Sequence, residues 1–213
     1  MAILRLSAVI VIFALIVNFS NAYAAKAKDG ELVDSDFTYK GIALSDSEEK
    51  VLKKLGKPVF TRNRSVYGVA VRYLEYKNDV TIGIMERNNT VADITIGDKK
   101  YKARKNIRYG ATTHYIEKIY GHKEREMLDG EIIYKYEKPN AKYEYLILTL
   151  DSENHSLKRI RITRLPLTEE AADIMGEDPL LSNDLFVILA GEEDIDTSAL
   201  KKQKPVKVEG LEK

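Results

Sequence analysis

The sequence predicts an α+β protein with two repeated units, each a helix followed by a three-stranded antiparallel meander, and a C-terminal helical arm. Three observations predict this class. A helix-like segment recurs after about 65 residues. Both copies end at a glycine, and both are followed by runs of β-branched and aromatic residues. We expect the first unit to span residues 41–105 and the second to span residues 106–165.

The two predicted helices lie within residues 42–56 and 107–121, which align without a gap. Ser45 and Glu48 match a capping box, in which two side chains satisfy free backbone donors of the first helical turn. Gly56 and Gly121 suit the left-handed position that ends a helix. Pro58 cannot continue a helix, so it makes the first end firmer.

Three strands are expected after each helix, at residues 66–76, 80–86 and 91–96 in the first unit and 131–136, 143–150 and 157–163 in the second. One such unit is close to the lower size limit for a stable domain, so we expect the two units to share a core. The predicted core residues are Val51, Leu52, Leu55, Val71, Tyr73, Ile82, Ile84, Ile94, Ile96, Ile116, Ile119, Tyr120, Leu146, Leu148, Ile160 and Ile162.

The phrase Leu-Ser-Asp-Ser-Glu-Glu-x-Val-x-x-x-Leu-Gly-Lys-Pro at residues 44–58, with the strand order over residues 41–165, resembles the opening of two related families. They are the β-lactamase inhibitor protein repeats and the SmpA and OmlA outer-membrane lipoprotein domain. The resemblance implies a tandem unit with a curved sheet, which those families use to hold other proteins. The chain has no lipidation cysteine, and in this it departs from the lipoprotein family.

Residues 1–24 match a secretory signal peptide, with a positive charge at Arg5, an apolar run from Leu6 to Phe19 and a small-residue cleavage site. The apolar run is shorter than the roughly 20 residues of a membrane-spanning helix, although an uncleaved anchor is the alternative. We therefore expect an exported chain in the bacterial periplasm, the cell envelope or outside the cell, with no transmembrane segment after cleavage. The absence of cysteine in an exported chain favours a bacterial source.

The two ends of the exported chain differ in composition. Residues 25–40 are predicted to be a linker, and residues 166–213 an acidic helical arm and flexible tail. Residues 166–196 contain ten acidic residues and no basic one, whereas residues 25–165 have an excess of Lys and Arg. In the arm, Thr168 is expected to cap a helix ending at Gly176, and the apolar residues around Phe186 are expected to dock on the body.

The sequence contains no motif that specifies a catalytic, metal or cofactor site. His114, His122 and His155 stand alone, without the spacing of a zinc site, and no nucleophile elbow or P-loop is present. We therefore expect no metal, no cofactor and no enzymatic activity. The alternative is an envelope-associated glycan hydrolase that uses two carboxylates, for which the candidates are Glu75, Glu86, Asp93 and Glu137.

Tyrosine is unusually frequent: the chain has thirteen tyrosines and no tryptophan, and eleven of the tyrosines lie from Tyr67 to Tyr145. A tyrosine combines an apolar ring with a hydroxyl group, which suits a half-exposed binding surface. Basic residues are interleaved with these tyrosines. The predicted binding residues are Tyr73, Tyr76, Tyr134, Tyr136, Tyr143, Tyr145, Arg104, Arg108 and Arg161.

The leading functional hypothesis is an exported, non-catalytic binding protein that presents a Tyr-rich, basic sheet surface to an exported or envelope protein, or to an anionic envelope polymer. Export argues against nucleic acid as the partner. The plain alternatives are that strands favour tyrosine in any protein and that the basic residues form an ordinary solvated face. A further alternative is that the acidic arm covers the basic face. A third possibility is a self-associating protein whose exposed strand edges pair between copies.

Overall fold

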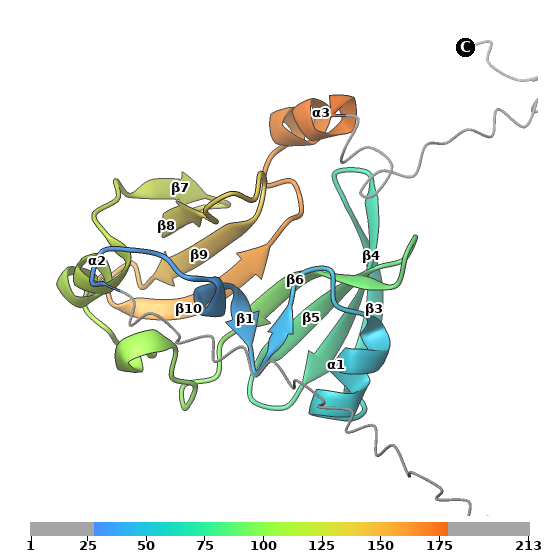
Figure 1. Cartoon of the computed structure of the whole chain (residues 1–213), viewed down its shortest axis with the longest axis horizontal. Coiled ribbons are helices and arrows are strands. Elements are labelled where there is room, and N and C mark those ends of the chain that lie inside the picture. The colour runs from blue at the N-terminus through green and yellow to red at the C-terminus, as the bar shows by residue number, and fades with distance from the viewer. Residues whose placement is uncertain (1–27, 179–213) are drawn as a thin grey trace, which may run out of the picture.

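One eight-stranded antiparallel sheet organises the chain (Figure 1). The structure, a computed structural model, describes residues 28–178, so the predicted signal peptide and the predicted arm beyond residue 178 lie outside the described residues. The strand order is β3-β4-β5-β6-β10-β9-β8-β7. The strands are β3 (Phe60–Val66), β4 (Val69–Tyr76), β5 (Val80–Met85), β6 (Thr90–Ile96), β7 (Glu126–Leu128), β8 (Glu131–Glu137), β9 (Tyr145–Leu150) and β10 (Leu157–Thr163).

Three α-helices occur within residues 28–178, and with the sheet they confirm the α+β class. They are α1 (Glu48–Leu55), α2 (Thr113–Tyr120) and α3 (Glu169–Glu177). The segment before α1 contains a 3-10 helix, η1 (Asp34–Phe37), and a small hairpin of β1 (Thr38–Tyr39) and β2 (Ile42–Ala43). A second 3-10 turn, η2 (Arg104–Asn106), lies between β6 and α2.

Four strands follow each of the first two helices, not three as expected. Residues 66–76 are not one strand, because Tyr67 and Gly68 form a tight turn with positive φ angles of 46° and 88° between β3 and β4. β3 is an edge strand whose first six residues are exposed, so it shows no apolar alternation by which it could be recognised. β7 is only three residues long, and it too lies at an edge.

The helices begin and end close to the predicted residues, with two exceptions. Gly56 and Gly121 end α1 and α2 with φ angles of 78° and 93°, as expected. The cap of α1 is Ser47, whose hydroxyl accepts a hydrogen bond from the Lys50 backbone N–H, and not the predicted Ser45. Thr168 caps α3 as expected, but the helix continues through Gly176 to Glu177 and does not end at the glycine.

A single large apolar cluster lies on one face of the sheet, between the strands and α1, α2 and the β1–β2 hairpin. It contains side chains of both halves of the sheet, for example Ile82 and Leu148. Most of the predicted core residues are buried, but Leu52 is 40% exposed on the outer side of α1. Val71 and Tyr73 belong to a smaller cluster on the opposite face, where Met175 of α3 packs.

The two halves of the sheet meet where β6 pairs with β10, from Ile160 opposite Ile96 to Thr163 opposite Asp93. On the face away from α1 and α2, Arg161 Nε donates a hydrogen bond to Asp93 Oδ1 at 2.7 Å. The Asp93 side chain is only 3% exposed. Gly83 makes room for it, because a Cβ there would lie 2.9 Å from Cβ of Asp93.

Among residues 28–178, no helix combines the length and the apolar character that are needed to cross a membrane.

We predict that Arg161→Met strongly destabilises the fold, because it leaves the buried Asp93 carboxylate without its counter-charge. Breaking one partner of a buried ion pair costs about 3–5 kcal/mol, and Arg161 is partly exposed, so we expect the lower end of this range. Denaturant unfolding measures it. The matched control is Arg62→Met, which breaks the more exposed Arg62–Glu75 pair and should cost about 1 kcal/mol or less. Equal effects of the two substitutions would contradict this account.

Candidate functional site

The six predicted binding tyrosines do not form one surface. Tyr134 and Tyr136 are 0% and 1% exposed and belong to the large apolar cluster, because residues two apart on β8 point to the same side. Their hydroxyl groups donate hydrogen bonds to Glu117 at 2.5 Å and to the Gly121 carbonyl at 2.9 Å. Expecting these two side chains on a recognition surface was therefore wrong.

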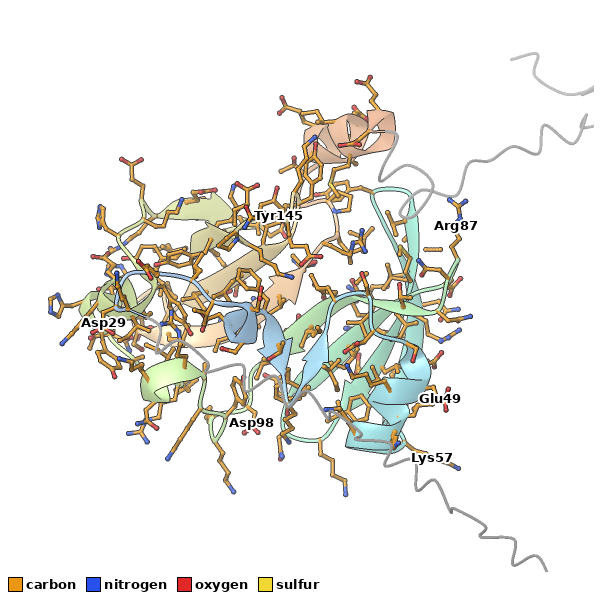
Figure 2. All side chains as sticks on the ribbon, in the orientation of Figure 1. Asp29, Glu49, Lys57, Arg87, Asp98 and Tyr145 are labelled. Atoms are coloured by element: carbon orange, nitrogen blue, oxygen red, sulfur yellow. The ribbon has the colours of Figure 1, made fainter. Side chains whose placement is uncertain are left out.

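Three of the other tyrosines lie on or beside the face opposite α1 and α2. Tyr73 is 8% exposed, and burial together with the nearby Asp93 carboxylate raises its pKa to about 12. Tyr143 and Tyr145 are half-buried, and lysine ammonium groups lie 4.7 Å and 6.0 Å from their ring centroids. Tyr145 is labelled in Figure 2. Only a small part of the predicted tyrosine set is thus accessible on this face.

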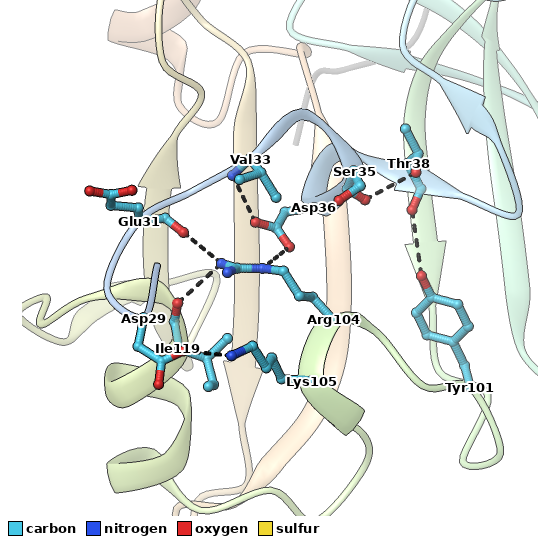
Figure 3. A network of polar contacts seen from close by, with 10 residues as sticks. All are labelled: Asp29, Glu31, Val33, Ser35, Asp36, Thr38, Tyr101, Arg104, Lys105 and Ile119. Atoms are coloured by element: carbon cyan, nitrogen blue, oxygen red, sulfur yellow. Dashed lines mark hydrogen bonds and ion pairs between the residues drawn. The ribbon is translucent and has the colours of Figure 1, made fainter. Parts of the chain in front are cut away.

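Arg104, another predicted binding residue, is a structural residue instead (Figure 3). Its Nε donates to Asp36 at 2.8 Å, and its Nη2 donates to the carbonyl oxygens of Glu31 and Ile119 at 2.6 Å and 3.1 Å. The guanidinium lies 5.2 Å from the Tyr120 ring centroid. The remaining nitrogen, Nη1, is buried and has no hydrogen-bond partner within residues 28–178. Only 12% of the Arg104 side chain is exposed, so it offers little surface to a ligand.

The sheet face opposite α1 and α2 is less basic than expected, because most of its cations are paired with acids, although Arg64 on β3 has no ion pair in the described part of the chain. Arg161, the third predicted arginine, is held by Asp93, and other pairs on this face join strands β3, β4, β7, β8 and β10. These pairs are Arg62–Glu75, Lys135–Glu126 and Arg159–Glu131. Paired charges give a weaker net field than unpaired ones, so the paired part of this face attracts a polyanion less than unpaired cations do.

Of the cations without an ion pair in the described part of the chain, some, such as Arg64, Lys118 and Lys123, lie elsewhere, but seven lie in connections along one edge of the molecule. We call this set the basic rim. It comprises Lys40, Lys57, Lys77, Lys99, Lys100, Lys102 and Arg108. The rim residues lie in the β1–β2 turn, the α1–β3 and β4–β5 connections, and the segment between β6 and α2. Lys57 and Asp98, which mark two of these connections, both lie along the lower edge in Figure 2.

The connections of the basic rim are joined by direct contacts. The rings of Tyr39 and Tyr101 lie 5.1 Å apart, and the Gly97 N–H donates to the Asp79 carbonyl at 2.7 Å. The Asp79 side chain packs closely against Gly97, where a Cβ would collide with its carboxylate. The Asp98 carboxylate accepts a hydrogen bond from the Lys100 backbone N–H at 2.9 Å. Both acids near the rim are therefore held by backbone contacts.

One cavity of about 370 Å³ opens at the basic rim, and we call it the lysine cavity. It is lined by Tyr39, Lys40, Leu55, Lys57, Val59, Tyr76, Lys77, Asn78 and Val80. Its lining contains three lysines and no acid. Tyr76, one of the predicted binding residues, is half-buried here, and its hydroxyl group donates to the Gly56 carbonyl at 3.3 Å. Burial, and then the Glu48 carboxylate, raise the pKa of Tyr76, so it stays a neutral hydroxyl.

A second cavity of about 560 Å³ lies beside the start of α2. Its lining includes the predicted Arg108 together with Lys102, Tyr109 and Tyr115, and again no acid. The Tyr115 hydroxyl donates to the Lys105 carbonyl at 2.6 Å, which ties α2 to the preceding segment. The basic rim therefore has two hollows, each lined by tyrosines and cations.

The carboxylates considered for a glycan hydrolase are not arranged as a close pair on the sheet. Glu75 and Asp93 are held by arginines. Asp93 and Glu137 lie on the same row across β6, β10, β9 and β8, three strand spacings apart, or about 14 Å. Glu137 lines another cavity, of about 460 Å³, together with Glu31 and His122.

Histidine forms no metal cluster in the described residues. His122 Nδ1 lies 3.3 Å from Glu117 Oε2, and no group of three or more His, Cys, Asp or Glu side chains within residues 28–178 is placed to hold a metal ion.

Sequence reasoning missed the lysines of the lysine cavity because they are distant in the chain. Lys40 and Lys77 occupy turns, and Lys57 follows the end of α1. Turn residues such as Gly41 and Asn78 mark two of these positions, but only the tertiary packing of the β1–β2 hairpin and α1 beside the sheet brings the turns together. A charge in a turn has no periodicity that reveals its neighbours.

No family model matches the chain, and no curated protein matches it. The resemblance to β-lactamase inhibitor protein repeats and to the SmpA and OmlA domain therefore stays a prediction. Among solved structures, an extracellular protein with an SCP domain from Bacillus anthracis is 18% identical over 65% of this chain and 49% of that chain, with a TM-score of 0.43. This chain thus spans about half the length of that protein.

Two further solved structures are similar over comparable parts of the chain. The DUF4309 family protein YjgB from Bacillus subtilis is 14% identical over 63% of this chain and 87% of that chain, with a TM-score of 0.42. The uncharacterised protein YfeY from Escherichia coli is 14% identical over 64% and 95%, with a TM-score of 0.40. TM-scores this low establish neither a shared fold nor a shared function.

We predict that the chain loses stability as the pH rises from about 10 towards 12. Burial raises the pKa of Tyr101 to about 12, followed by the effects of Tyr39 and Asp36. An unfolded tyrosine ionises near pH 10. Between these values the folded chain holds more protons than the unfolded chain, so rising pH favours unfolding. Tyr101→Phe should flatten this dependence in denaturant unfolding at several pH values. An unchanged slope would contradict the role of Tyr101.

Proposed function

We propose that this chain is an exported, non-catalytic binding protein that holds an anionic polymer of the cell envelope on its basic rim. The observation that carries the proposal is the contrast between two surfaces. On the sheet face most of the cations named above are paired with acids, whereas seven rim cations have no ion pair among the described residues. Unpaired cations are free to meet anions brought by a partner.

The geometry of the rim favours a polymer over a compact ligand. The seven cations come from four separate connections, and an extended chain of anions can contact several of them at once. One exposed ion pair contributes about 1 kcal/mol or less, so a single contact binds weakly. Several contacts on one polymer act together, because each later contact forms within the same complex. Such binding weakens as salt screens the charges.

Tyrosines support the same proposal. Tyr39, Tyr76, Tyr109 and Tyr115 line the two hollows of the rim. A tyrosine ring gives a rigid apolar wall beside polar groups, as in many binding surfaces. The rim therefore combines rings with cations, which is the combination that the sequence predicts, although most of its residues differ from those expected.

Export is part of the proposal and rests on the sequence. The predicted signal peptide places the exported chain in the periplasm, the envelope or the medium. At these locations a basic surface meets anionic polymers of the envelope and not nucleic acid. The protein partner considered in the sequence analysis would use the opposite sheet face, where most of the cations are already paired.

We further propose that the two halves are copies of one unit. In both, a short helix capped by a hydroxyl residue, Ser47 or Thr112, ends at a glycine and is followed by four antiparallel strands. The β6–β10 pairing would then join the last strands of the two copies. The boundaries at residues 41–105 and 106–165 are part of this proposal.

We predict that Lys100→Gln with Lys102→Gln weakens the binding of residues 25–213 to a polyanion about tenfold at low salt, since each lost contact contributes up to about 1 kcal/mol. Isothermal titration with polyglutamate and with polyphosphate measures the affinity and shows which anion is preferred. Binding of the unchanged protein should fall steeply as salt is added.

The matched control is Lys118→Gln with Lys123→Gln, which removes the same charge from α2 and from the third residue after its end, outside the basic rim. This control should change the affinity by less than about twofold, the effect of net charge alone. If both double variants weaken binding equally, attraction is by overall charge and the rim is not a site. If neither polymer binds at low salt, the proposed function fails.

A further inference from the structure

We infer that the lysine cavity is a discrete site for a phosphate group attached to an apolar or ring-shaped body. This inference deepens the proposed function and rests on it, because it assumes that the rim meets anions. It adds that one hollow selects a particular anionic group. The observation behind it is that the two parts of the cavity lining have different chemistry.

The polar part of the lining consists of cations from three elements that are far apart in the sequence. Lys40 comes from the β1–β2 turn, Lys57 follows α1, and Lys77 lies in the β4–β5 connection. None of the three has an ion pair in the described part of the chain, and no acid lines the cavity. Three ammonium groups around one hollow suit an anion with more than one charge, such as phosphate, because lysine binds phosphate as a point charge.

The apolar part of the lining favours a ligand that carries an apolar group beside its phosphate. Leu55, Val59 and Val80 line the cavity together with Tyr39 and Tyr76. Val59 is 67% exposed, which is unusual for a valine and leaves apolar surface open to a ligand. The hydroxyl of Tyr76 is directed to the Gly56 carbonyl, so its ring forms a wall. A bare phosphate cannot use this surface.

The cavity is held in shape by contacts at each of its edges. Lys54 Nζ donates to the Lys40 carbonyl at 3.1 Å and so fixes the β1–β2 turn against α1. The Val59 N–H donates to the Glu75 carbonyl at 2.7 Å, which holds the α1–β3 connection on β4. A site whose backbone is already in place loses little entropy when a ligand binds.

The size of the cavity sets the extent of the ligand. A volume of about 370 Å³ lies near the lower end of the range for small-molecule sites, roughly 300–1,000 Å³. It therefore accepts one phosphate and one ring or short chain, not a length of polymer. The phosphate can be a free monoester or a group carried by an envelope polymer, and these two sources share the same chemistry.

The experiment uses residues 25–213 and follows backbone amide chemical shifts during titration with phenyl phosphate, inorganic phosphate and benzoate. We expect phenyl phosphate to shift the amides of Lys57, Lys77 and Val80, and to bind at least tenfold more tightly than either other probe, because only phenyl phosphate uses both parts of the cavity. Addition of polyphosphate shows whether a polymer competes for the same amides.

Two variants separate the parts of the site. Lys57→Gln with Lys77→Gln should weaken phenyl phosphate at least fivefold, whereas Val59→Ser should reduce the preference for phenyl phosphate over inorganic phosphate. Lys118→Gln with Lys123→Gln, outside the basic rim, is the matched control and should change phenyl phosphate binding by less than about twofold. Because Lys57 and Lys77 are exposed and have no ion pair in the described chain, their substitution does not threaten the fold.

Equal affinities for phenyl phosphate and inorganic phosphate would overturn the inference, as would shifts that avoid the cavity. If polyphosphate binds the rim while phenyl phosphate shifts no cavity amide, the proposed function stands and this inference fails. If neither ligand binds, both fail.

Discussion

The basic rim depends on the buried ion pair between Arg104 and Asp36. The Asp36 side chain is 0% exposed, and it also accepts a hydrogen bond from the Val33 N–H at 2.9 Å. Arg104 comes from the segment between β6 and α2, Asp36 from η1, and the carbonyl of Ile119 from α2. Three parts of the chain that are distant in sequence therefore meet at one guanidinium (Figure 3).

This contact determines where the cations of the segment point. Arg104 is directed inward and is only 12% exposed, while its neighbours Lys102 and Arg108 line the cavity beside α2. Lys105 is tied to Asp29 at 2.9 Å. In this segment Arg104 therefore points inward, whereas Lys102 and Arg108 belong to the rim. Loss of the Arg104 side chain would leave Asp36 buried and unpaired, at a cost in folding stability of about 3–5 kcal/mol.

The fold could be predicted from the sequence where periodicity or special backbone conformations left a signal. Gly56, Gly121 and Thr168 mark helix ends because few other residues suit those positions. Runs of β-branched, aromatic and other apolar residues mark the core strands, for example β5 and β9. β3 and β7 were missed because an exposed edge strand buries too little apolar surface to show a pattern.

The sequence predicts the types of residue in the candidate site, but not most of the individual residues. Tyr76 and Arg108 were placed in a binding surface and do line the two hollows, but Tyr134, Tyr136 and Arg104 are buried. A tyrosine on a strand looks the same in the sequence whether its side chain faces the core or water, because residue type alone does not show on which side of the sheet it lies. Likewise, no charge pattern shows which arginine has a carboxylate within reach.

The central claim is that unpaired cations on the rim, and not the paired charges of the sheet face, meet an anionic partner. Its most direct test is to map backbone amide shifts over the whole of residues 25–213 while a polyanion is added. We expect shifts to concentrate in the turns and segments of the rim, around Lys57, Lys77 and Lys99. Shifts concentrated on β3, β9 and β10, around Arg62, Tyr145 and Arg161, would contradict it.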